Sequence, residues 1–240
     1  MLKLDSYEYI CKSISDIPEQ AKPYARVEVL SHLGESISLM FSEFSKAFPL
    51  TVMAMEKFWS KPIACFEKRL ATGSWLTVLL LEKSNLNLFF DLRSNDYPLY
   101  GSEYDNAHAM LPGKWRELYR AFESFGIVEG SVKPMRWCNT PFCYSGRLTI
   151  EEYRRRTGSS KSGVQRFVRE VGTDQLMCWL LTEAGDALFL DEARCDQKVY
   201  HVRDSAFDDV AVLRNPDVVM DRYLAHYVAG RNPAEFDFRA

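Results

Sequence analysis

The feature that most constrains this chain is an apolar segment that occurs twice, at positions 75–93 and 175–193. Each copy has the pattern of a buried strand, a tight polar turn and a second apolar run that ends in an aspartate. At a constant offset of 100 residues, the identical pairs include Leu80 and Leu180, Leu81 and Leu181, Leu88 and Leu188, Phe89 and Phe189, and Asp91 and Asp191. The repeat predicts two related β-hairpins and indicates an internal duplication.

The composition predicts a folded chain with a substantial core. Of the 240 residues, 47% are hydrophobic and 13% are aromatic, which argues against disorder. The formal net charge of −3 gives no overall attraction to nucleic acid or to anionic lipid. No apolar run approaches the roughly 20 residues that span a bilayer, and the first residues lack a secretory signal. We therefore expect a soluble, cytoplasmic protein.

The cysteines and histidines form no metal-binding pattern. Six cysteines stand at irregular spacings, at positions 11, 65, 138, 143, 178 and 195. The four histidines, at positions 32, 108, 201 and 226, make no paired spacing with them. Reduced, mostly buried thiols fit this chain better than a disulfide framework does. We predict no metal site and no cofactor.

The residues before the first hairpin predict helices. Apolar residues recur at three- and four-residue steps over 24–48, which indicates one long amphipathic helix or two short ones. Pro49 is expected to end this helical region. Residues 50–70 are ambiguous between strand and helix, and Cys65 to Leu70 favour a short helix.

The first hairpin is predicted over 75–92 and is followed by a helix over 111–125. That helix has one aromatic face, and Gly126 is a natural end for it. Residues 128–146 contain several glycines and prolines and form the best candidate linker.

The second half begins with a capping box, since Thr149 and Glu152 have the spacing of a helix start. A Gly/Ser break at 158–163 precedes a helical piece at 164–171 and the second hairpin. A last helix follows Pro216, and the polar tail 231–240 is expected to be loose.

The predicted fold is α+β, with two related units that each have a mostly antiparallel, curved sheet flanked by helices. The first unit covers residues 1–130 and starts with helices, and the second covers 131–240.

Catalytic chemistry finds little support in the sequence. No Ser or Cys stands in a nucleophile motif. The segment Gly158 to Gly163 resembles a phosphate loop only superficially, because the first glycine and the preceding buried strand are missing. Asp91 and Asp191 occupy equivalent strand ends, as the acids of hydrolases often do, but a repeated structural position explains them equally well. We predict no catalytic residues.

The charge pattern points to binding. The segment from Glu183 to Asp209 contains eight acidic and three basic residues. This excess of acids fits either an ordinary solvated face or a surface that attracts a basic partner. The predicted partner-binding residues are Tyr97, Tyr100, Glu103, Tyr104, Asp105, Glu183, Asp186, Asp191, Glu192, Asp196 and Tyr200. A basic cluster over 154–169 fits phosphate contacts or pairing with this acidic face, and the acidic chain makes nucleic acid the weaker reading.

Several segments between 111 and 228 resemble the SUKH superfamily. Leu-Pro-Gly-Lys-Trp-Arg-Glu-Leu-Tyr at 111–119 is similar to the family's Leu-Pro helix, and 180–191 resembles its strand–Gly-Asp–strand segment. Residues 198–200 are similar to the following strand, and 218–228 to the closing helix. The chain departs from the pattern after the Leu-Pro helix, where it has Phe-Gly in place of Asn-Gly.

The resemblance implies an α+β fold with a curved, mostly antiparallel sheet packed by helices. It also implies a function, because many members are bacterial immunity proteins that bind a cognate toxin and block it without catalysis. We therefore expect a non-enzymatic protein that occludes the active site of a basic toxin such as a nuclease. The alternatives are a regulatory or scaffold protein of the same fold, and a hydrolase that uses Asp91 or Asp191.

Overall fold

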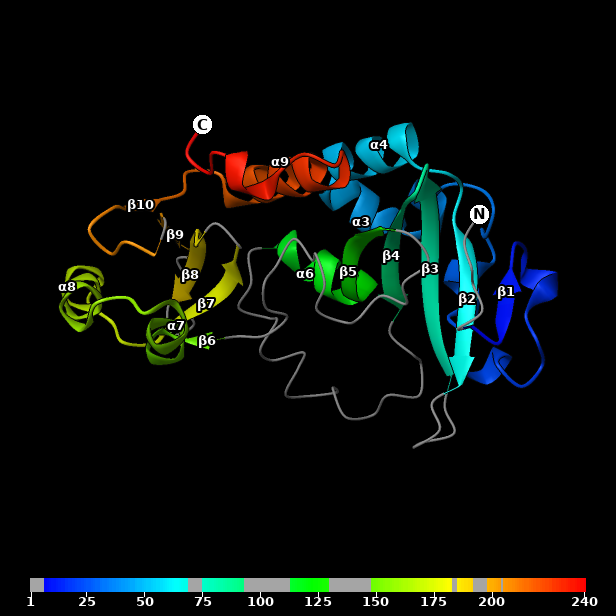
Figure 1. The fold of residues 1–240 in the computed structure, drawn as a ribbon, viewed down its shortest axis with the longest axis horizontal. Coiled ribbons are helices and arrows are strands. Elements are labelled where there is room, and N and C mark those ends of the chain that lie inside the picture. Colours follow the sequence, from blue (N-terminus) through cyan, green and yellow to red (C-terminus); the bar gives the residue numbers. More distant parts are fainter. Residues whose placement is uncertain are drawn as a thin grey trace.

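The computed structural model describes residues 7–68, 75–92, 113–129, 148–182, 185–191, 198–203 and 205–240. Within these ranges the chain has the predicted α+β fold, with two antiparallel five-stranded sheets that lie side by side along the molecule (Figure 1). Sheet A has the order β1 (Tyr9–Cys11), β2 (Ile63–Lys68), β3 (Trp75–Lys83), β4 (Leu86–Leu92) and β5 (Phe122–Glu129). Sheet B has the order β10 (Val210–Val212), β9 (Val199–Val202), β8 (Ala187–Asp191), β7 (Leu176–Leu181) and β6 (Leu148–Thr149).

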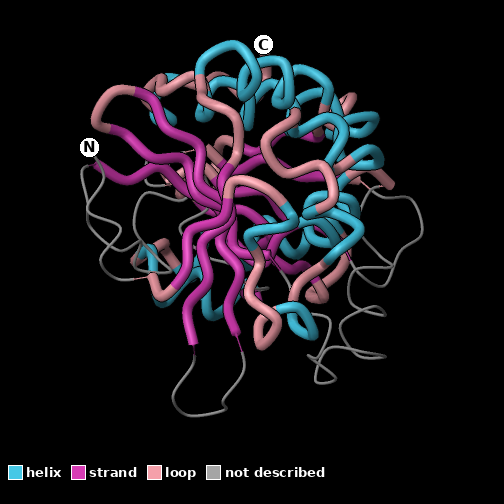
Figure 2. Tube along the Cα trace, turned by 90° about the vertical axis from the view of Figure 1, so that its right-hand side faces the viewer, coloured by secondary structure: helices cyan, strands magenta, loops and turns pink. Residues whose placement is uncertain are grey.

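The helices gather mostly above and beside the strands (Figure 2). Those that accompany sheet A are α1 (Val27–Leu30), α2 (Ile37–Met40), α3 (Ser42–Ala47), α4 (Pro49–Phe58) and α6 (Trp115–Ala121). The later ones are α7 (Ile150–Thr157), α8 (Lys161–Val171) and α9 (Pro216–Val228). In the described part of the chain, every helix is too short or too polar to span a bilayer.

Both predicted hairpins are present, as β3–β4 and β7–β8. Their strand pairing differs, because Leu80 lies opposite Phe89 whereas Leu180 lies opposite Leu188, next to an irregularity that begins at Cys178. Their neighbours differ too, since strand β2 precedes the first hairpin and helix α8 precedes the second. The hairpins are thus confirmed, and the internal duplication stays a prediction.

One apolar core connects the two sheets. Phe90 of β4 and Trp115 of α6 belong to the same contiguous cluster of buried side chains as Leu188 of β8 and Tyr223 of α9. A separate cluster around Phe167 lies between sheet B and helices α7 and α8. Because burial of apolar surface is the main stabilising term, the shared core couples the two sheets energetically.

Helix α9 packs on the helices of the first half and lies beside α4 (Figure 1). The indole N–H of Trp59 donates to the carbonyl of Val228 at 2.8 Å, and the N–H of Ile127 donates to the Tyr227 hydroxyl at 2.9 Å. The predicted boundary at 130/131 separates the strands of sheet A from those of sheet B. Helix α9 belongs to the second half of the chain but packs on α4 of the first half.

Asp221 of α9 caps the N-terminus of α4. Phe48 stands at the capping position of α4 and offers no side-chain acceptor. Instead, the Asp221 carboxylate accepts the N–H of Leu50 at 3.0 Å and the N–H of Thr51 at 2.9 Å. Its side chain is 5% exposed, and the Thr51 hydroxyl lies 2.7 Å from the same carboxylate. A buried acid therefore satisfies donors that would otherwise be orphaned, and it complements the helix dipole.

Two predictions in the first half are wrong. Pro49 does not end the helical region; it begins α4, because the first turn of a helix needs no N–H from that residue. Cys65 and Phe66 lie in strand β2 and not in a helix. Strand β2 pairs with β3 along its whole length, and this tertiary pairing decides a locally ambiguous sequence.

The helix predicted over 111–125 is also shorter than expected. Described from residue 113 onward, it covers Trp115–Ala121, and Phe122–Glu129 forms strand β5 on the edge of β4. The Phe122 ring packs on those of Phe41, Phe44 and Phe90 at centroid distances of 4.8, 5.1 and 4.6 Å. The predicted linker 128–146 lies mostly outside the described residues.

The start of the second half follows the prediction. The Glu152 N–H donates to the Thr149 hydroxyl at 3.2 Å, and the Thr149 N–H donates to the Glu152 carboxylate at 2.8 Å, which completes the capping box of α7. Gly158 ends α7 in the left-handed conformation, with φ 69°. Helix α8 starts at Lys161, earlier than predicted, and Ser160 caps it.

Candidate functional site

The predicted partner-binding residues fall into two groups. The larger group lies outside the described residues and comprises Tyr97, Tyr100, Glu103, Tyr104, Asp105, Glu183, Glu192 and Asp196. The other three are buried, since Asp186 and Asp191 are 7% exposed and Tyr200 is 8% exposed. Tyr200 belongs to the Phe167 cluster, which lies between sheet B and helices α7 and α8. Asp191 is the last residue of β8 in the same sheet. The prediction that these three residues contact a partner directly is therefore wrong, because almost none of their surface is exposed.

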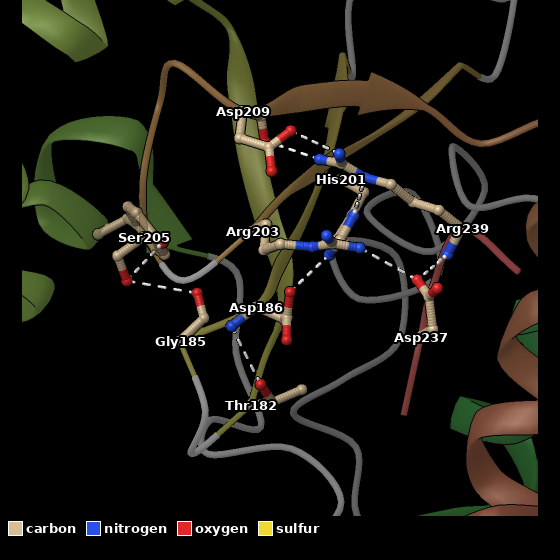
Figure 3. A network of polar contacts seen from close by, with 10 residues as sticks. Thr182, Gly185, Asp186, His201, Arg203, Ser205, Asp209, Asp237 and Arg239 are labelled. Atoms are coloured by element: carbon tan, nitrogen blue, oxygen red, sulfur yellow. Dashed lines mark hydrogen bonds and ion pairs between the residues drawn. The ribbon is translucent and has the colours of Figure 1, made fainter. Parts of the chain in front are cut away.

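Asp186 instead belongs to a network of polar contacts around the buried His201 (Figure 3). The His201 side chain is 1% exposed, and its Nε2 lies 2.7 Å from Asp186 Oδ1. The Arg239 Nε–H donates to His201 Nδ1 at 3.0 Å. Because a guanidinium only donates, Nδ1 must be an acceptor, so the ring proton lies on Nε2 and is donated to Asp186. Both ring nitrogens are therefore engaged.

Arg239 extends the network to Asp209. Its Nη1 lies 2.5 Å from Asp209 Oδ1, and its Nη2 donates to the Asp209 carbonyl at 2.7 Å. The hydrogen bond from Arg239 is the main reason why the pKa of the Asp209 carboxyl lies below its ordinary value. Asp237 also takes part. Its carboxylate accepts the backbone N–H of Arg239 at 2.9 Å and lies 3.1 Å from the Arg203 guanidinium. We call these residues, with Asp186 and His201, the His201 network.

The tail 231–240 is therefore not loose, and that prediction is wrong. Phe238 is 1% exposed, and its ring lies 5.1 Å from the His201 ring and 5.0 Å from that of Tyr223. The Arg222 guanidinium donates to the Ala240 carbonyl at 2.6 Å. The ring contacts of Phe238 with His201 and Tyr223, together with the charge-assisted hydrogen bonds, thus fix the tail between α9 and strand β9.

Ser205 lies beside this network without completing a catalytic triad. Its N–H donates to the Gly185 carbonyl at 2.9 Å, and its Oγ lies 3.1 Å from the Tyr153 hydroxyl (Figure 3). His201 bonds to Asp186 and Arg239, so it has no free nitrogen with which to activate a hydroxyl. The contacts of Ser205 and His201 instead connect the second hairpin, through Gly185 and Asp186, to β9 and to Arg239 of the tail.

No group of three His, Cys, Asp or Glu side chains suited to a metal occurs among the residues that the structure describes. Cys11 and Cys65 are buried free thiols, and burial raises the pKa of Cys11 to about 11 and that of Cys65 to about 12. Such thiols are protonated and poorly reactive at neutral pH.

A surface cleft lies among helices α1, α2, α3 and α6. It has a volume of about 420 Å³. Its lining includes buried apolar side chains, Val29, Met40, Phe41, Phe44 and Ala121, and three glutamates, Glu28, Glu43 and Glu117. We call this site the glutamate cleft. Its lining combines carboxylates with apolar side chains, as binding sites commonly do.

Two of the three glutamates of the cleft are largely exposed. Glu28 lies 3.3 Å from the Arg26 Nε, and Glu43 lies 2.6 Å from the Lys46 ammonium, but the side chains of these glutamates are 65% and 66% exposed. Exposed ion pairs of this kind contribute only about 0–1 kcal/mol, so these carboxylates remain open to competition from another cation. Arg26 is more enclosed, at 23% exposure, and donates to the carbonyl of Ala121 at 3.4 Å.

The apolar lining of the cleft is well supported. Phe122 packs edge-on against both Phe41 and Phe44, and Phe44 stacks on Phe48 at 5.1 Å. Leu39, which also lines the cleft, is 52% exposed and offers apolar surface at the opening. Sequence reasoning missed this site because its residues come from short helices up to 95 positions apart, as in the contact between Arg26 and Ala121.

Comparisons with models of protein families, with curated proteins and with solved structures find no match to this chain. The resemblance to SUKH proteins therefore stays a prediction.

Proposed function

We propose that this chain is a non-enzymatic bacterial immunity protein that binds a basic protein toxin in the cytoplasm and occludes its active site. The observation that carries the proposal is the glutamate cleft, which Glu28, Glu43 and Glu117 line together with apolar side chains. A toxin that acts on nucleic acid presents positive charge at its active site, and an acidic, partly apolar surface complements it.

The fold supports the same proposal. Two antiparallel sheets flanked by helices belong to the class that the SUKH resemblance implies. The shared core and the capping of α4 by Asp221 hold the helices on a firm scaffold, and a preorganised surface loses less entropy on binding. Tyr97, Tyr104 and Asp105, which lie outside the described residues, stay predicted contacts.

The alternative functions differ in what they require. A regulatory or scaffold protein would bind a partner that is not toxic, so the toxicity of the partner separates the two readings. A hydrolase built on Asp91 or Asp191 is disfavoured, because these side chains are only 4% and 7% exposed. A catalytic acid or base must come within hydrogen-bond distance of its substrate.

Co-expression with the protein encoded by the adjacent gene tests the proposal. We expect this chain to restore growth of cells that produce that protein, and to be recovered with it as a stable complex. An unrelated nuclease toxin serves as the specificity control and should still kill the cells. The absence of both protection and a complex with the adjacent gene's product would contradict the proposed function.

A further inference from the structure

We propose that helices α7 and α8 form a helix-turn-helix that binds double-stranded DNA through the exposed face of α8. Such binding is a further function, and it does not depend on the proposed immunity to a toxin. Three features carry it: the turn that joins the two helices, their packing on sheet B, and the basic side chains that this packing leaves exposed.

A short turn joins the two helices. Helix α7 ends at Thr157 and α8 begins at Lys161, so three residues lie between them. In this turn Gly158 takes the left-handed conformation, and Ser160 caps α8 because its hydroxyl oxygen accepts the N–H of Gly163 at 3.1 Å. Two helices joined by a turn of three or four residues that contains a glycine are the arrangement with which helix-turn-helix proteins place their second helix in the major groove.

The inner faces of both helices pack on the same aromatic side chains. Tyr153 of α7 is 0% exposed and Phe167 of α8 is 1% exposed. Their rings lie 5.0 and 5.8 Å from the Phe189 ring, and 5.7 and 5.3 Å from the Phe207 ring. The two helices are therefore a fixed unit on sheet B, and α8 lies at the end of the molecule farthest from sheet A (Figure 1).

The outer face of α8 is polar and basic. Exposed side chains on it are Lys161, Gln165, Arg166 and Arg169. Positions 161, 165 and 169 follow at four-residue steps, so they share one side of the helix, opposite the buried Phe167. Glutamine and arginine are the side chains that bond adenine and guanine in a bidentate way in the major groove, and lysine contacts phosphates.

The local charge favours phosphate although the whole chain is acidic. Residues 150–171 contain six basic and three acidic side chains, whereas the chain has a net charge of −3. Two of these acids are already bonded at the start of α7, since Glu151 accepts from Arg154 at 2.6 Å and Glu152 accepts the N–H of Thr149 at 2.8 Å. Salt screens charges that are more than about 10 Å apart, so acids elsewhere in the chain have little effect on this surface.

Fluorescence anisotropy with a labelled DNA duplex tests the inference. The probe is a mixed-sequence duplex of about 20 base pairs, which is two helical turns, titrated with the full chain at low salt. We expect a dissociation constant on the order of 1–100 μM and an affinity that falls as salt is added. An RNA duplex of the same sequence should bind roughly tenfold more weakly, because its narrow major groove does not admit a helix.

Paired lysine and arginine variants locate the binding surface. Lys161→Ala/Arg169→Ala should weaken DNA binding roughly tenfold and reduce the slope of log affinity against log salt by about 2. The matched control is Lys46→Ala/Lys57→Ala, which removes two exposed lysines from α3 and α4 and should change neither quantity. All four side chains are exposed, so both variants should keep the circular dichroism spectrum of the wild type.

Removal of acids from the same helices should have the opposite effect. Glu151 and Glu170 are 54% and 62% exposed, and Glu151→Gln/Glu170→Gln should bind DNA roughly threefold more tightly because it repels phosphates less. Glu28→Gln/Glu43→Gln makes the same change in net charge on α1 and α3 and should leave the affinity for DNA unchanged.

Three outcomes would each overturn the inference. They are the absence of DNA binding at low salt, an equal loss of affinity in Lys161→Ala/Arg169→Ala and in Lys46→Ala/Lys57→Ala, and equal affinity for the DNA and RNA duplexes. Salt-dependent binding of the DNA duplex that only the α8 variant weakens would support it. None of these measurements involves the toxin, so the immunity function is tested separately.

Discussion

The His201 network and the glutamate cleft are both built from acids and bases, but they differ in exposure and in purpose. In the network, His201 is 1% exposed and each ring nitrogen has a partner. In the cleft, Glu28 and Glu43 are about two-thirds exposed and make pairs that water weakens. The difference teaches that the buried His201 and Asp186 hold the fold together, whereas the exposed pairs of Glu28 and Glu43 are weak enough for the cation of a partner to compete with them.

The largest effect is expected where a buried carboxylate caps a helix. Asp221→Ala removes the acceptor for the N–H groups of Leu50 and Thr51 and leaves them buried. We expect a loss of about 3 kcal/mol in the free energy of unfolding, measured by urea denaturation. The exposed control Asp174→Ala should stay within about 0.5 kcal/mol of the wild type. A similar small change in Asp221→Ala would contradict the role of this cap.

A smaller but clear effect is expected at Arg239. Arg239→Ala leaves His201 Nδ1 without its donor and frees the tail from Asp209. We expect a loss of about 1–3 kcal/mol and faster proteolytic cleavage after residue 230. The matched control is Arg155→Ala, which removes one arginine from the exposed face of α7. It should change neither the free energy of unfolding nor the rate of cleavage. An unchanged cleavage rate in Arg239→Ala would show that the contacts of Arg239 do not hold the tail.

The network also predicts a pH dependence. The pKa of Asp209 is lower in the folded state than its ordinary value of 3.8, so its ionised form stabilises the fold. This contribution is complete above pH 3.8 and is lost as the pH falls through the folded-state pKa. Wild type should therefore lose more stability between pH 5 and about pH 2 than Asp209→Asn does. Parallel curves for the two proteins would show that the Arg239 contact does not stabilise the fold.

The smallest effect on stability is expected in the glutamate cleft. Glu28→Gln/Glu43→Gln removes two exposed pairs, so we expect a change of less than about 1 kcal/mol in the free energy of unfolding. The circular dichroism spectrum should match that of the wild type. A loss as large as that of Asp221→Ala would mean that these glutamates are structural, and the contrast between the two regions would fail.

Local pattern in the sequence predicted the elements whose signals are local. The hairpins at 75–92 and 176–191 follow from two apolar runs around a turn, and the capping box of α7 needs only Thr149 and Glu152. The helix after Pro216 is also local, since α9 begins at that proline.

The errors arose where distant partners decide the structure. Phe122 has helical spacing to Leu118, but β4 offers a strand partner and the segment becomes β5. The tail looked loose because Arg239 and its partner His201 are 38 positions apart, and Asp221 caps residues about 170 positions away. The cleft was missed for the same reason, because its glutamates at 28, 43 and 117 converge only in the fold.

The affinity of the chain for its toxin tests the central claim most directly. Isothermal titration calorimetry of the adjacent gene's product would compare the wild type, Glu28→Gln/Glu43→Gln and the control Glu151→Gln/Glu170→Gln. We predict that the cleft variant binds roughly tenfold more weakly and that the control matches the wild type. Equal affinity of all three proteins would contradict the assignment of the glutamate cleft as the functional surface.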